Sequence, residues 1–292
     1  MILNLKDLNP IEKQYYLQHV IAPRPVCFAS TIDKAGNVNI SPFSFFNMFS
    51  SNPPIVIFSP ARRVRDNTTK HTLQNVLEVP EVVINIVTYD IVQQASLSSC
   101  DYPKGVDEFI KAGLTKEKAT MVAPPMVKES KVKLECKVVE IKPLGTEGGA
   151  GNLVICEVLC IHIDDSLLNE SKKFDQSKLE LVARLGGDWY CRVTQDNLFI
   201  VPKPNSKLGI GIDALPQSIK CSKILSGNHL GMLANVEVLP GQNELLLNEE
   251  IKNTLLKCST NEWEEKIHRL AADLLNKNKV EEAWQVLLMR ST

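Results

Sequence analysis

The sequence predicts a mainly β fold, an antiparallel barrel with peripheral helices, followed by a helical C-terminal extension. Short apolar or alternating segments succeed one another through residues 24–163, with few helical segments between them. This succession favours an antiparallel barrel over a doubly wound parallel sheet. Beyond about residue 240, apolar residues recur at helical spacing instead.

The chain is predicted to begin with a polar lead-in and a short helix over residues 1–22. Residues 24–32 form the first predicted strand. Asp33 and Gly36 suit a short hairpin loop, because Asp closes local turns and Gly accepts a positive φ. The chain then returns as a second strand through Val38.

Two more strands and one helix complete the first half. Strands are predicted at 55–59 and at 82–87, the second a short apolar run typical of a buried strand. A helix over 67–79 lies between them, with Asn67 or Thr68 as its expected cap.

Two longer strands are predicted over residues 131–141 and 153–163, and the glycine-rich loop between them makes them a hairpin. Apolar and charged residues alternate in the first, so we expect one buried and one solvated face, with Glu135 on the solvated one. His162 stands in the second strand without an evident partner, and we expect it to be a packed core histidine.

Composition excludes several classes of function. The chain has 292 residues, 44% of them hydrophobic, and a net charge of −1 from 33 basic and 34 acidic residues. No basic excess is present to bind nucleic acid, and no apolar run reaches the roughly 18 residues of a membrane span. No secretion signal is evident, so a cytoplasmic protein is expected.

The eight cysteines show no spacing that suits a metal or a disulfide framework. Cys156 and Cys160 lie in one predicted strand, about 13 Å apart, which is too far for both sulfurs to bind one zinc ion. We therefore expect buried free thiols in a reducing compartment and no metal site.

The character of the chain changes after the Pro-Lys-Pro segment that ends at residue 204. We divide it into a barrel domain, 1–208, and a loop and helical extension, 209–292. Within the extension, helices are predicted over 244–258 and from a capping-box sequence at 259–262 onward, and a last short helix ends near residue 288.

The most informative segment is 24–60. It reads R-P, then S-T-x-D-x-x-G-x-x-N-x-S-P-x-S-x-F, then P-P. Its short donors and acceptors beside exposed backbone suit the polar edge of a flat heterocycle. In this pattern the sequence resembles the flavin reductase-like family of FMN-binding split barrels. The segments 103–109 and 184–190 also resemble that family, and the likeness extends over about residues 12–205.

The resemblance implies a closed, six-stranded Greek-key barrel and a set of FMN contacts. Those to the ring and ribityl chain fall on Ser30, Thr31, Asn39, Ser41, Pro42, Phe43 and Ser44. Those to the phosphate fall on Arg62, Lys70, Thr72 and Asn75, where His71 replaces the aspartate usual in the family motif. Two alternatives stay open: the hydroxyls close local turns, and the arginines of 62–65 form a solvated turn.

The function implied by the resemblance is an NAD(P)H:flavin oxidoreductase that moves hydride from NADH or NADPH to bound FMN. Hydride transfer requires no acidic or basic side chain, and no catalytic residue is assigned. A homodimer with flavin at the interface is expected. Arg184 and Tyr190 approach the flavin or the partner, or else seal the barrel. Trp263 and Trp284 either extend the interface or pack on their own barrel.

Two other functions remain open: a flavoredoxin-like electron carrier that holds FMN without a nicotinamide site, and a non-enzymatic flavin- or ligand-binding module whose C-terminal helices recruit a partner. A dinucleotide-binding Rossmann site is not supported. Gly209 and Gly211 supply two of its three glycines, without the third and without a following helix.

Overall fold

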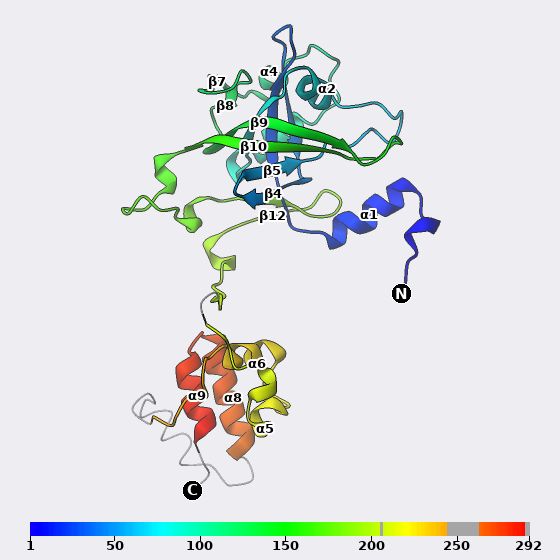
Figure 1. Ribbon diagram of the computed structural model, residues 1–292. Coiled ribbons are helices and arrows are strands. Elements are labelled where there is room, and N and C mark those ends of the chain that lie inside the picture. Colours follow the sequence, from blue (N-terminus) through cyan, green and yellow to red (C-terminus); the bar gives the residue numbers. More distant parts are fainter. Residues whose placement is uncertain (205–206, 244–262, 290–292) are drawn as a thin grey trace. The chain divides into compact units, whose positions relative to one another are not determined.

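The structure is a computed structural model that describes residues 1–204, 207–243 and 263–289. Its internal contacts divide the chain into two compact units, Met1–Phe199 and Ile200–Thr292, and each is described by itself. The expected domain boundary near residue 208 stays a prediction. The colours of Figure 1 follow the chain through both units.

The first unit is built on a seven-stranded antiparallel sheet in the order β3-β2-β6-β9-β10-β5-β4 (Figure 1). The strands are β2 (Cys27–Ile32), β3 (Val38–Phe43), β4 (Phe46–Ser51), β5 (Pro54–Phe58), β6 (Glu81–Ile86), β9 (Val132–Pro143) and β10 (Asn152–Ile163). The resemblance implied six strands, and the seventh arises because residues 46–51 form a separate strand against β5. Strands β3 and β4 stand at the two ends of the order, so closure of the barrel stays a prediction.

The hairpin of β2 and β3 forms as the sequence predicts. Asp33 Oδ1 accepts the backbone N–H groups of Ala35 (2.9 Å) and Asn37 (2.8 Å), and Gly36 has a φ of +89°. Both faces of β2 are buried. Cys27 and Ala29 pack on one face of the sheet with residues of β6 and β9, and Phe28 packs on the other face.

Helices and two small sheets cover the second face of β2. Phe28 packs there with residues of α3 (Val92–Leu97), of α4 (Glu108–Ala112) and of the loops beside them. The remaining elements of this unit are η1 (Leu5–Asp7), α1 (Pro10–Val20), β1 (Arg24–Pro25), α2 (His71–Glu78), η2 (Tyr89–Ile91), α3 (Val92–Leu97), α4 (Glu108–Ala112), β7 (Lys116–Glu117), β8 (Met126–Val127), η3 (Asp165–Leu167), η4 (Gln176–Lys178), β11 (Val182–Arg184), β12 (Tyr190–Arg192) and η5 (Gln195–Asn197).

Helix α2 starts four residues later than predicted. Asn67 has a φ of +56°, and its side-chain oxygen accepts from Arg62 Nε (2.6 Å) rather than from a helix N–H group. Lys70 occupies the N-cap position without a side-chain capping bond. The predicted caps are therefore wrong, because Arg62 and Asn67 close the preceding loop.

The expectations for Glu135 and His162 are also wrong. Glu135 is fully buried, and its carboxylate accepts the N–H groups of Thr120 (2.9 Å) and Met121 (2.5 Å). His162 Nε2 lies 2.5 Å from Glu135 Oε1, so the histidine does have a carboxylate partner. The loop before β8 folds over the outer face of β9 and converts a predicted solvated face into a buried one.

The expectation of buried thiols holds for only part of the cysteines. Within the described residues all are free, and three of them, Cys27, Cys136 and Cys156, are buried. Cys100 and Cys221 are exposed.

The second unit has its own apolar core, formed by η6 (Ile212–Ala214), α5 (Gln217–Lys220), α6 (Gly227–Ala234), α8 (Trp263–Asn276) and α9 (Val280–Leu288). Trp284 is buried in this core and donates from Nε1 to the carbonyl of Leu233 at 3.2 Å. It therefore packs in the core of its own unit. The helix predicted over 244–258 and the capping box at 259–262 lie outside the described residues. No described helix combines the length and apolarity needed to cross a bilayer.

Candidate functional site

Four of the predicted FMN contacts bond to one another or to Glu108 inside the protein. Asn75 Nδ2 donates to Thr31 Oγ1 (3.1 Å), and Thr72 Oγ1 donates to Asn39 Oδ1 (2.7 Å). The amide of Asn39 in turn donates to Glu108 Oε1 (2.8 Å). All five side chains are buried. Their polar groups already have partners, as buried polar groups require.

Glu108 is the acidic end of the chain of bonds through Thr72 and Asn39, and no role was predicted for it. It opens α4, and burial raises the pKa of its carboxyl above the ordinary glutamate value, although Asn39 and the N–H of Ile40 donate to it. Its position in the segment 103–109 was the only sequence signal for it.

Lys70 is different. Within the described ranges its ammonium forms no hydrogen bond or ion pair, and it lies 5.5 Å from the centre of the Phe43 ring. Burial lowers the pKa of Lys70, and the positive charge of Arg63 lowers it further. A partly buried cation of this kind is suited to an anion that the chain itself does not provide.

Arg63, rather than Arg62, stands beside Lys70. Arg63 Nη2 donates to Asp101 Oδ1 at 2.6 Å, and Arg65 also pairs with this carboxylate. The hydrogen bonds from Arg63 are the largest cause that holds the pKa of Asp101 below its usual value. Arg62 is instead bound to Asn67. Asp101 is 38 residues from Arg63 in sequence, so no local signal indicated the pair.

Two small cavities are lined by further predicted residues, Ser41, Pro42, Phe43 and Ser44. The first, of about 130 Å³, is lined by Val26, Pro42, Phe43, Ser44, Ser96, Ser99, Arg184 and Tyr190. The second, of about 20 Å³, is lined by Asn39, Ser41, Arg63, Lys70, His71, Ser99, Cys100, Asp101, Tyr102 and Glu108. Because Ser99 borders both, they are adjacent parts of one cleft with cations at one end and an aromatic wall at the other.

The aromatic wall is held in place by Arg184. Its Nη1 donates to the Tyr190 hydroxyl at 2.6 Å, and its guanidinium lies 4.7 Å from the centre of that ring. Ser30 lies outside both cavities, fully buried, and its hydroxyl has no hydrogen-bond partner within the described residues. The cofactor roles of the eleven predicted residues stay predictions.

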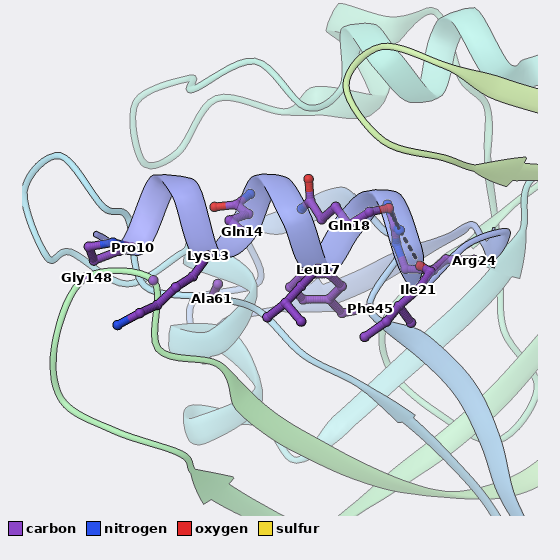
Figure 2. Close-up of a pocket in the computed structure, with 11 residues that line it drawn as sticks. Pro10, Lys13, Gln14, Leu17, Gln18, Ile21, Arg24, Phe45, Ala61 and Gly148 are labelled. Atoms are coloured by element: carbon purple, nitrogen blue, oxygen red, sulfur yellow. Dashed lines mark hydrogen bonds between the residues drawn. The ribbon is translucent and has the colours of Figure 1, made fainter. Parts of the chain in front are cut away.

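A larger cavity than these two, of about 500 Å³, lies elsewhere, between α1 and the barrel (Figure 2). Leu17 of α1 faces Phe45 across it, and Arg24 closes one end. Its lining is mainly apolar, and no residue of α1 is buried. We assign the candidate site to the smaller cleft, because that cleft brings an unpaired cation and free hydroxyls together.

Known proteins are similar to this chain in sequence and in fold. The family sequence model described as flavin reductase like domain matches residues 20–178. An uncharacterized protein of Aquifex aeolicus is 37% identical over 173 residues, which cover 59% of this chain and 86% of that protein.

Two solved structures extend the comparison. Nitrilotriacetate monooxygenase component B from Bacillus cereus is 27% identical, with a TM-score of 0.64 over 69% of this chain and 98% of that one. A protein of Shewanella frigidimarina with a split-barrel domain is 28% identical, with a TM-score of 0.59 over 70% of this chain and 99% of that one. Because the family model matches residues 20–178, more than half of its length, the chain belongs to the flavin reductase-like family.

Proposed function

We propose that this protein binds FMN and moves hydride from NADH or NADPH to it. The observation that carries the proposal is the ammonium of Lys70, which forms no hydrogen bond or ion pair within the described residues and lines one cleft with Ser41 and Ser44. The family membership and the similarity to nitrilotriacetate monooxygenase component B from Bacillus cereus support it. An oxygenase that consumes reduced flavin is accordingly the proposed electron acceptor.

The cationic end of the cleft fits a phosphate. A phosphate monoester carries close to two negative charges at neutral pH and favours charged donors. Lys70 supplies one charge without losing any existing bond, and Arg63 supplies a second when it releases Asp101. His71, which replaces the aspartate usual in the family motif, lines the same cavity, and a neutral imidazole does not repel a phosphate there as a carboxylate would.

The other end of the cleft fits the ring system. Pro42 and the Tyr190 ring supply flat apolar surface, and Ser44 supplies a hydroxyl without another partner in the described residues. Bound FMN would supply the hydride-accepting chemistry, so this chain needs only to orient the ring and limit water.

FMN needs more room than the cleft provides as described. Its two cavities, about 130 and 20 Å³, are smaller than the roughly 300–1,000 Å³ of typical ligand sites. The segment that carries Ser99 and Asp101 forms one wall of both, and we propose that it moves outward when FMN binds.

Assembly and location remain part of the proposal. Met48 and Phe49, on the edge strand β4, are 64% and 65% exposed. Neighbouring exposed apolar side chains of this kind support a homodimer. We also propose barrel closure, flavin at the subunit interface, a cytoplasmic location and a barrel domain of residues 1–208.

An absorbance spectrum of the purified protein, reconstituted with FMN and treated anaerobically with NADH and then NADPH, tests the function. We expect a yellow protein that bleaches within seconds and thereby identifies its donor. A yellow protein that is reduced only by dithionite would instead establish a carrier. A protein that does not retain added FMN would refute the proposal in both forms and leave a binding module.

A further inference from the structure

Near the end of strand β10, a register shift moves the side chains to the opposite face of the sheet. Strict alternation would place Cys160 on the same face as Cys156 and Val158, toward the barrel core. The register shifts after Val158, so Val158 stands opposite Cys136 but Cys160 stands opposite Glu135. Residues that pair directly across antiparallel strands share a face. Cys160 therefore lies on the outer face with Glu135.

His162 follows on the same face, because it pairs with Lys133, two residues from Glu135. Its Nε2 lies 2.5 Å from Glu135 Oε1 and 3.8 Å from Cys160 Sγ. The three donor atoms all lie within 4.8 Å of one another. Bulges are over-represented where a strand must redirect a side chain toward a functional site.

We propose that Glu135, Cys160 and His162 bind one Zn²⁺ ion, with a water molecule as the fourth ligand. Oxygen, sulfur and imidazole nitrogen are the donors that zinc takes in proteins, and three protein ligands with a water form a common arrangement. Tetrahedral Zn–S and Zn–N bonds place sulfur and nitrogen about 3.6 Å apart, close to the present separation of the Cys160 and His162 donors.

Charge favours this ion. On binding, the Cys160 S–H bond breaks, its proton passes to solvent and a Zn–S bond forms. The thiolate and the Glu135 carboxylate then balance the two positive charges of zinc. Lys133, which stands opposite His162 in the sheet, is itself compensated by Glu117, whose Oε2 lies 2.8 Å from its Nζ.

The carboxylate is held in place before any metal arrives. Glu135 Oε2 accepts the N–H groups of Met121 (2.5 Å) and Val122 (3.1 Å), and such bonds orient a metal ligand. The separation of Glu135 Oε1 and His162 Nε2 must grow to about 3.3 Å in a tetrahedral site. The imidazole makes this movement, because the His162 side chain is 29% exposed whereas Glu135 is fully buried.

Titration of the full-length, chelator-treated protein with Zn²⁺ by calorimetry tests the site. We expect one zinc per chain, and a thiolate-to-metal charge-transfer band when Co²⁺ replaces it. C160S and H162Q should each weaken zinc binding by about tenfold or more, which is about 1.4 kcal/mol. C191S, which changes a partly buried free thiol outside the cluster, should bind zinc as the wild type does.

Stability provides a second readout that does not depend on the flavin. Because a ligand that binds only the native state raises its stability, zinc should raise the melting temperature of the wild type and of C191S but not of H162Q. Binding of less than one zinc per chain, a Co²⁺ complex without a thiolate band, or zinc affinity unchanged in both C160S and H162Q would each overturn the proposal. Glu135 and His162 would then form only a hydrogen-bonded pair.

Discussion

The predicted FMN contacts separate into two groups that share a sequence pattern but differ in their bonding. Asn39 and Thr72 are buried and bonded within the protein. Lys70, Ser41 and Ser44 line the cleft, and within the described chain their side chains form no hydrogen bond. The family pattern thus contains residues that hold the walls of the cleft together and residues whose side chains are available to a ligand. Their hydrogen bonds within the protein distinguish the two groups.

Replacement of Asn39 by Ala should have the largest effect, and it falls on stability. The change removes the Asn39 amide from Glu108 Oε1 and from the Thr72 hydroxyl. Unsatisfied buried groups cost about 1–3 kcal/mol each, so a loss of about 3–4 kcal/mol is expected in urea unfolding. S41A, the control from the other group, should lose less than about 0.5 kcal/mol. Equal losses in both variants would remove the distinction.

Replacement of Lys70 by Ala should act on binding instead. Loss of one charged hydrogen bond to phosphate, about 1.5–3 kcal/mol, should weaken FMN binding about tenfold to hundredfold in a fluorescence titration. The urea midpoint should stay about the same, because within the described residues the ammonium has no hydrogen bond or ion pair to lose, only its contact with the Phe43 ring. K128A, which removes an exposed lysine outside the cleft, is the control and should leave FMN affinity unchanged. Wild-type FMN affinity in K70A would contradict the phosphate assignment.

The pH dependence of stability distinguishes the buried group further. The raised pKa of Glu108 means that the folded protein holds this proton more tightly than the unfolded chain does. The associated stability is complete below the ordinary glutamate pKa of about 4.3 and is lost as pH rises through the higher folded value. Urea midpoints measured across this range should fall with pH less in E108Q than in the wild type. The exposed-site variant E140Q is the control, and an E108Q slope equal to that of the wild type would exclude this role.

Replacement of Asp101 by Asn should have the smallest effect and the opposite sign. The carboxylate competes with a phosphate for Arg63, so its loss should tighten FMN binding about threefold, which is typical of an exposed ion pair. E180Q breaks the exposed pair with Arg192 and should leave FMN affinity unchanged. Weaker FMN binding in D101N would show that the carboxylate supports the cleft rather than blocking it.

Local chemistry explains which elements were predictable. The hairpin at Asp33 and Gly36 formed as expected, because its turn depends on residues within four positions of one another. The start of α2 was misplaced because Arg62 binds Asn67 and competes with helix capping. The spacing of Lys70 in the family motif indicated a residue of the cleft. The same spacing could not show that Thr72 is bonded to Asn39.

The sequence by itself determined the antiparallel strands, the family and the segment around which the cleft is built, because alternation, turns and motif spacing are short-range properties. Tertiary structure decided the partners. Asn39 meets Glu108 across 69 residues, and the shifted register of β10 brings Cys160 and His162 to Glu135. Such pairings depend on how distant segments pack and on which buried polar groups need a hydrogen-bond partner. The local sequence around each residue determines neither.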